Sequence, residues 1–171
     1  MTLSVSLDHL LAYTEWERDT WYAWFPRQRA GAFTTSFGPN GDGRFSTVAD
    51  VVRHIFSSEK RYIDRLSRRT VTDPASIPAE FPALFEFGRE ARKDLLKFLA
   101  DFPAERWDVA EDHMILGPPP LRLTPRKIVV HVVLHEIRHW AQIATTARLQ
   151  GLKVEPHDFL FSPILGGGLQ R

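Results

Sequence analysis

The chain has 171 residues, 43% of them hydrophobic, which is enough for one well-buried domain and short for two. Twenty-two basic and 21 acidic residues give a formal net charge of +1, so no global field attracts nucleic acid or an anionic membrane. The absence of cysteine excludes disulfides and thiolate ligands and leaves histidine and carboxylate to hold any metal. We therefore predict a single domain over residues 1–171, with neither nucleic acid nor a membrane as partner.

The N-terminal segment MTLSVSLDHLLAY has neither a basic region nor a long apolar region. No stretch of the sequence approaches 18 uninterrupted apolar residues, the length that a membrane span requires. The expected location is the cytoplasm.

Two helices are predicted in the first part of the chain. Residues 7–25 carry apolar side chains at a roughly helical period, and Pro26 ends the run. Residues 26–46 contain many glycines and polar residues and are predicted to form a long loop. Thr47 and Asp50 then match a capping box, and an apolar face continues from them to about residue 68.

Two further helices are predicted in the second part. Apolar residues spaced by three and four predict a helix from residue 81 to the stop at Pro103, after a connection of about ten residues long enough to cross the end of a bundle. Three consecutive prolines forbid helix within residues 112–123, which are expected to be extended or to form a short turn. The last helix spans residues 124–150, with Thr124 as its cap and Gly151 after its end. Four helices without a strand signal predict an all-α four-helix bundle, a fold that builds metal sites from facing helices.

Three histidines recur every four residues in the segment IVVHVVLHEIRHWAQI, which places His131, His135 and His139 on one stripe of the last helix. His131 and His139 are about 12 Å apart along the axis, too far to bind one ion. The pair is therefore either His131 with His135 or His135 with His139, and a third ligand must come from another helix. His54 is the only other histidine well inside a predicted helix. The remaining histidines lie near a terminus or in a loop, where a solvated ring is expected: His9, His113 and His157.

The string His135-Glu136-Ile137-Arg138-His139 also matches HExxH, the signature of zinc metalloproteases. A metzincin requires a further glycine and histidine downstream, and Gln142 and Thr145 stand in that region instead. Glu136 lies about 100° from the histidine stripe. We interpret the match as coincidental and Glu136 as a partner of a histidine, a general base or an ion-pair partner of an arginine.

Two segments resemble the DinB/YfiT-like family of metal-binding four-helix bundles. They are TVADVVRHIFSSEKRYIDRL, with His54 early in its helix, and HVVLHEIRHWAQIATTARLQG, similar to the pattern H-x3-H-x3-H-x-x-Q-I that ends at a glycine. The resemblance implies an up-down-down-up bundle and a divalent metal, zinc or nickel, held by His54, His135 and His139, with His131 beside them on the stripe. The arginine and glycine that usually follow the last histidine in the family are replaced here by Trp140 and Ala141.

Some relatives are thiol-dependent transferases or isomerases, and many others have no assigned reaction. One hypothesis is a metal-dependent enzyme of thiol S-transferase or hydrolase type. Three histidines leave open metal positions, where a water or thiol binds with lowered pKa. In such an enzyme a low-molecular-weight thiol would be a cofactor, and the candidates to orient it are Glu136, Glu59 and Arg138. The sequence does not specify the small-molecule substrate. The alternatives are a non-catalytic metal-binding or stress-response protein with a structural metal, and an interaction module with structural histidines. The resemblance, together with 12 phenylalanines and five tryptophans, also predicts a homodimer.

Overall fold

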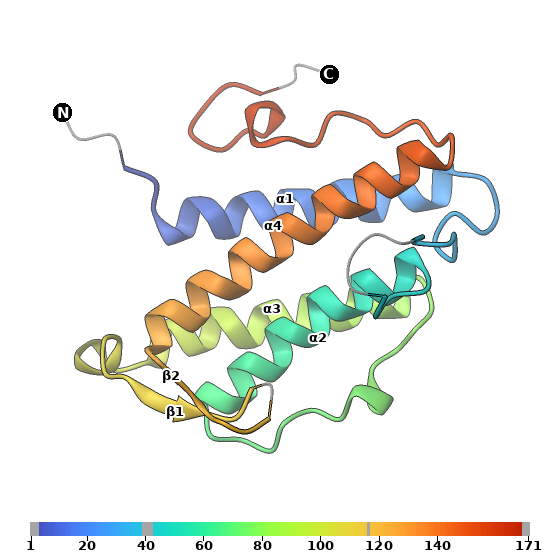
Figure 1. Ribbon diagram of the computed structural model, residues 1–171. Coiled ribbons are helices and arrows are strands. Elements are labelled where there is room, and N and C mark those ends of the chain that lie inside the picture. Colours follow the sequence, from blue (N-terminus) through green and yellow to red (C-terminus); the bar gives the residue numbers. More distant parts are fainter. Residues whose placement is uncertain (1–3, 39–42, 116, 169–171) are drawn as a thin grey trace. The chain divides into compact units, whose positions relative to one another are not determined.

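The computed structural model describes residues 4–38, 43–115 and 117–168 (Figure 1). Its long elements are four helices, and each begins and ends within two residues of a predicted bound. They are α1 (Leu7–Trp24), α2 (Val48–Leu66), α3 (Ala83–Asp101) and α4 (Pro125–Leu149). Part of the predicted 26–46 loop, residues 39–42, lies outside the described residues. Among the helices that are described, none combines the length and the apolar character needed to cross a bilayer.

The predicted helix ends are confirmed by their hydrogen bonds. The backbone N–H of Thr47 donates to Asp50 Oδ2 over 2.8 Å, and the N–H of Asp50 donates to Thr47 Oγ1 over 3.2 Å. Thr124 Oγ1 accepts from the N–H of Lys127 over 3.2 Å at the start of α4. Gly151, with φ of +73°, follows α4 in the left-handed conformation that glycine adopts without strain.

A short hairpin lies between α3 and α4, where the sequence carries no strand signal. Strand β1 (Glu111–His113) pairs antiparallel with β2 (Leu121–Leu123), so that Glu111 lies opposite Leu123 and His113 opposite Leu121. This segment was predicted to be extended or turned. Three residues per strand are too few to show the alternating pattern that identifies a strand in a sequence.

The described structure divides into two compact units. One contains Met1–Val51 with Glu136–Arg171, and the other contains Val52–His135. Helices α2 and α4 each run continuously from one unit into the other. The single-domain organisation stays a prediction.

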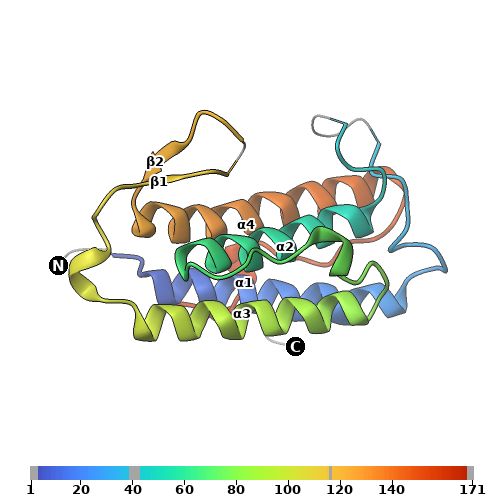
Figure 2. The ribbon, with the colours of Figure 1, turned by 90° about the horizontal axis from the view of Figure 1, so that it is seen from below.

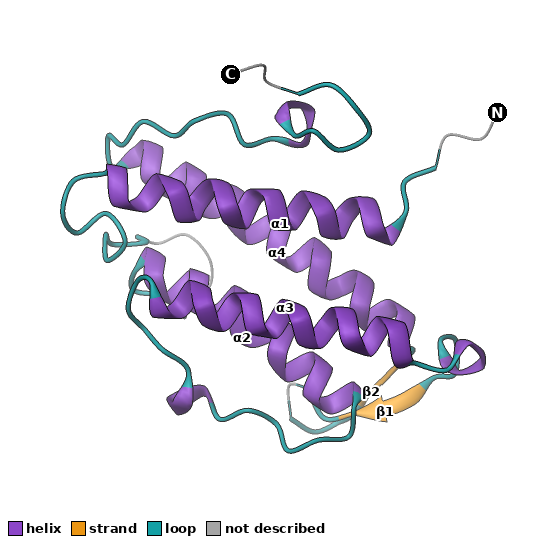
Figure 3. Ribbon diagram, turned by 180° about the vertical axis from the view of Figure 1, so that it is seen from behind, coloured by secondary structure: helices purple, strands orange, loops and turns teal. Residues whose placement is uncertain are grey.

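In the unit of residues 52–135, α2 and α3 run side by side (Figures 2 and 3). The ring of Phe56 packs edge-on against Phe85, with centroids 5.3 Å apart. Arg92 of α3 donates through Nε and Nη2 to Glu59 Oε2 of α2, over 3.2 and 3.1 Å, and both side chains are buried. Gly88 leaves no room for a side chain, because a Cβ built there would lie 2.7 Å from the Phe56 ring.

Gly88→Ala is therefore expected to destabilise the protein by about 1–3 kcal/mol through overpacking. Phe56 is fully buried and has little room to move. Denaturant unfolding measures the change in the free energy of unfolding, and Phe56→Leu provides the matched background because it shrinks the opposing side chain. An equal loss of stability on Gly88→Ala in the wild type and in Phe56→Leu would contradict the close contact between Gly88 and Phe56.

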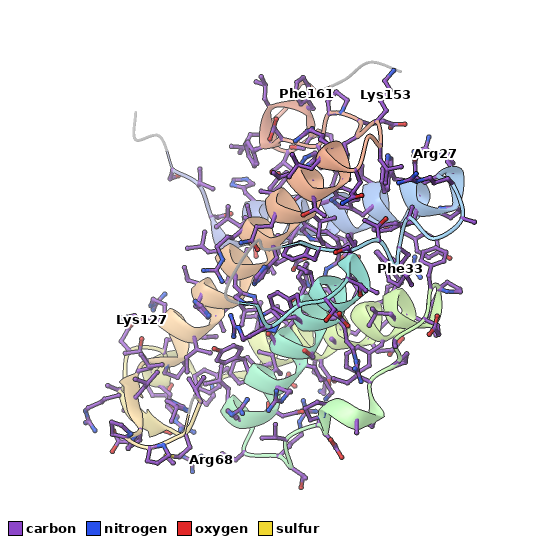
Figure 4. The ribbon with its side chains drawn as sticks, turned by 45° about the vertical axis from the view of Figure 1, so that its right-hand side comes forward. Arg27, Phe33, Arg68, Lys127, Lys153 and Phe161 are labelled. Atoms are coloured by element: carbon purple, nitrogen blue, oxygen red, sulfur yellow. The ribbon has the colours of Figure 1, made fainter. Side chains whose placement is uncertain are left out.

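In the unit of residues 1–51 and 136–171, α1 packs against the second part of α4 and against the C-terminal tail (Figure 1). The indoles of Trp21 and Trp140 stack with centroids 5.8 Å apart. Tyr13 Oη donates to the carbonyl of His157 over 3.0 Å, and Trp24 Nε1 donates to the carbonyl of Lys153 over 3.0 Å. Figure 4 labels Lys153, near the start of the tail, and Arg27, at the end of the short helix that follows α1.

His157 corrects the prediction of a solvated ring. It is 5% exposed, and its Nδ1 lies 3.0 Å from Oε1 of Glu17, which is itself 1% exposed. The second oxygen of Glu17 has no hydrogen-bond partner among the described residues. Burial raises the pKa of Glu17 above its ordinary 4.5, and repulsion from Glu136 adds to the rise, while His157 and Tyr13 act in the opposite direction.

Glu17→Gln is expected to raise the midpoint of thermal unfolding at pH 7, by about 2–4 °C for each 1 kcal/mol gained. A raised pKa means that the folded state favours the protonated carboxyl of Glu17. The stability that protonated Glu17 contributes is therefore fully present below pH 4.5 and is lost as the pH rises through the higher pKa of the folded state. The difference between variant and wild type should therefore vanish near pH 4. Asp19→Asn, an exposed change on the same helix, is the control. A midpoint difference independent of pH would be inconsistent with a buried, ionised Glu17.

Candidate metal site

The first two members of the site come from α2 and α4. His54 lies two turns into α2, and His135 lies in the middle of α4. Their Nε2 atoms are 2.9 Å apart and their ring centroids 4.8 Å apart. The two imidazoles therefore point nitrogen to nitrogen.

The distance between these nitrogens fits a shared metal ion. Metal–nitrogen bonds of about 2.0–2.1 Å that meet at about 90–110° place two imidazole nitrogens about 2.9–3.4 Å apart. A neutral imidazole has one donor and one acceptor nitrogen. A cation between the two Nε2 atoms would use both lone pairs, whereas a direct hydrogen bond uses one.

His139 lies one turn after His135 on the same continuous helix, so the spacing of four residues puts both rings on one stripe. His54, His135 and His139 each offer one ring nitrogen, and these nitrogens lie within 4.8 Å of one another. His135 and His139 are buried, and His54 is half-buried. These are the three histidines that the resemblance selects as ligands, and together they form a group able to hold a divalent metal.

Gln142 fixes the protonation of His139. Its Oε1 lies 2.6 Å from His139 Nδ1, and a carboxamide oxygen only accepts, so Nδ1 carries the ring proton. Nε2 is then left with its lone pair, as a metal ligand requires, and it accepts from Arg138 Nη2 over 3.4 Å. In the sequence, Gln142 is a departure from the protease pattern and the glutamine of the family pattern, and neither predicts its contact with His139. Its place three residues after a histidine in a helix was the signal for this contact.

The comparisons with known proteins concern the family and the fold of the chain. The model of the DinB family matches residues 3–165. The chain belongs to the DinB family. A crystal structure described as the conserved protein of locus from Enterococcus faecalis is similar in fold, with a TM-score of 0.63 and 13% identity over 85% of this chain and 98% of that one. No curated protein matches the sequence. The predicted family and the predicted all-α bundle fold are thus confirmed.

His131 of this DinB-family chain does not belong to the group of three. Its exposed ring contacts those of Tyr62 and His135, with centroids 5.6 and 5.4 Å away. It lies on the stripe beside the group, as predicted.

Glu136 is an ion-pair partner of an arginine, one of the three roles predicted for it. Its two oxygens accept from Arg18 Nε and Nη2 over 2.6 and 2.7 Å, and Oε1 also accepts from Trp140 Nε1 over 3.0 Å. All three side chains are buried. Glu136 therefore binds α1 and its own helix, which supports the interpretation that the HExxH match is coincidental.

Proposed function

We propose that this DinB-family protein binds one divalent metal, zinc or nickel, through His54, His135 and His139. The 2.9 Å approach of the His54 and His135 nitrogens carries the proposal, because two imidazole nitrogens at this distance fit the bonds of one shared cation. The tautomer that Gln142 imposes on His139 supports a third ligand. The shared family supports it as well.

We further propose that the protein is a metal-dependent enzyme of thiol S-transferase or hydrolase type. A bound metal supplies Lewis acidity toward a water or a small thiol. The chain contributes three neutral nitrogen ligands and a fixed His139 ring, and it has no cysteine, so a reacting thiol must be a separate molecule. Glu59 and Glu136 are both engaged with buried arginines, which leaves Arg138 as the sequence-predicted candidate to orient a ligand.

Elemental analysis of protein purified without a histidine tag tests the metal, and a turnover screen with small thiols then tests the enzyme. We expect about one zinc or nickel ion per chain, with binding that weakens below about pH 6, because a protonated imidazole does not ligate. Absence of metal after loading would reject the first proposal. Stabilisation by the metal without any turnover would instead favour a structural metal that ties α2 to α4.

We expect a homodimer, and light scattering at micromolar concentration should give twice the monomer mass of 19.6 kDa. Val130 and Leu134 lie one turn apart on α4 and are 37% and 52% exposed, so they offer an apolar strip to a second copy. Leu134→Lys should then give a monomer. Leu96→Lys, on α3 and also about half exposed, serves as the control that keeps the dimer. A wild-type mass near that of the monomer would reject the prediction.

A further inference from the structure

Arg138 is a cation beside the candidate metal site that lacks a carboxylate partner among the described residues. Its side chain is exposed, and its Nη2 donates to Nε2 of His139 over 3.4 Å. No carboxylate in the described part of the chain lies within ion-pair distance of it. Arg18 and Arg126, by contrast, each bind a carboxylate through two nitrogens.

Metal binding would release the Arg138 guanidinium. The lone pair of His139 Nε2 that accepts from Arg138 is the one that a metal needs, and one lone pair serves only one of them. The neighbouring carboxylate of Glu136 is buried and already accepts from Arg18 and Trp140. The N–H groups of the released guanidinium are therefore available to a ligand beside the site.

An aromatic ring also flanks His139. The Phe45 ring packs edge-on against it, with centroids 5.9 Å apart. Guanidinium groups bind carboxylates through paired, charge-assisted hydrogen bonds. The surroundings of His139 thus favour an anionic ligand over a neutral one.

We propose that Arg138 binds a carboxylate of the small molecule that the metal site accepts, so that the preferred ligand is a thiol or substrate bearing a carboxylate close to its metal-binding atom. The inference rests on the proposed metal site and names the chemistry of its ligand. Arg138 acts here as a specificity residue.

Two small thiols of equal length test the inference. Mercaptoacetate and 2-mercaptoethanol both carry a thiol on a two-carbon chain, but the first ends in a carboxylate and the second in a hydroxyl. The protein is loaded with Co²⁺, and the absorption band that a bound thiolate gives to Co²⁺ reports binding of each thiol at constant pH and salt. We expect the wild type to bind mercaptoacetate about tenfold more tightly, the scale of a charge-assisted hydrogen bond. Arg138→Gln should reduce the ratio to about one, and Arg138→Lys should retain part of it.

Arg148→Gln is the matched control, because Arg148 is exposed on the same helix about 15 Å further along the axis. It should keep the wild-type ratio. The inference is overturned if the wild type binds the two thiols with a ratio near one, or if Arg138→Gln leaves the ratio unchanged. In either case, normal uptake of Co²⁺ would still support the metal site. Loss of Co²⁺ uptake in Arg138→Gln alone also overturns it, since Arg138 would then serve to hold the metal. Failure of the wild type to take up Co²⁺ rejects the metal site itself.

Discussion

Replacing His135 by alanine is expected to reduce the metal content from about one ion per chain to background. His135 is the central member of the group, since its Nε2 faces that of His54 and its ring lies one turn from His139 on α4. Without it, the two remaining nitrogens come from different helices, His54 on α2 and His139 on α4. Two such ligands bind a metal only weakly. Elemental analysis after loading with zinc or nickel measures the effect.

Thermal unfolding gives a second measure of the same prediction. A ligand present at about a thousandfold over its dissociation constant stabilises the folded state by about 4 kcal/mol. The wild type should gain stability on this scale with added metal, and His135→Ala should gain none.

His131→Ala is the control for this substitution. His131 is on the same stripe of the same helix but outside the group of three, so its loss should leave the metal content unchanged. Full occupancy in His135→Ala would defeat the ligand assignment. Anomalous scattering within bonding distance of His131, with His139 turned away, would show that the other histidine pair on α4 holds the ion.

The helices and the two histidines of α4 were predictable because their signals are local. Thr47 and Asp50 are three residues apart, and His135 and His139 are four apart, so helix geometry alone relates each pair. The third histidine, His54, is 81 residues from His135, and periodicity left the choice of pair open. The family resemblance was needed to select the set.

The features that the sequence did not predict depend on residues far apart in the chain. His157 is buried because Glu17, 140 residues earlier, lies against it, and a pattern in the tail alone cannot show this. The role of Glu136 could be narrowed to three possibilities, but Arg18, which decides among them, is 118 residues away. A side chain's neighbours across a fold follow from packing, which local sequence does not encode.

Replacing Arg18 by methionine is expected to lower the free energy of unfolding by about 3–5 kcal/mol, because it leaves the charge of Glu136 buried without its cation. The two side chains are 4% and 2% exposed and joined by two short bonds, so water offers little compensation. In Arg18→Met/Glu136→Gln the charge is gone, while the carboxamide oxygen introduced by the second substitution can still accept from Trp140 Nε1. The double variant should therefore recover most of the loss.

Denaturant unfolding at pH 7 measures all of these variants, and Arg126→Met gives the matched control. Arg126 binds Asp108 through two nitrogens as well, over 2.7 and 2.9 Å, but both side chains are more than half exposed, so its loss should leave the free energy of unfolding almost unchanged. A loss below about 1 kcal/mol in Arg18→Met would mean that Glu136 is not held as a buried anion.

Glu136→Gln adds a functional comparison. If Glu136 binds α1 rather than a reacting water, the variant keeps its metal and whatever turnover the wild type has, whereas a general base of the HExxH type would lose turnover by about two to four powers of ten.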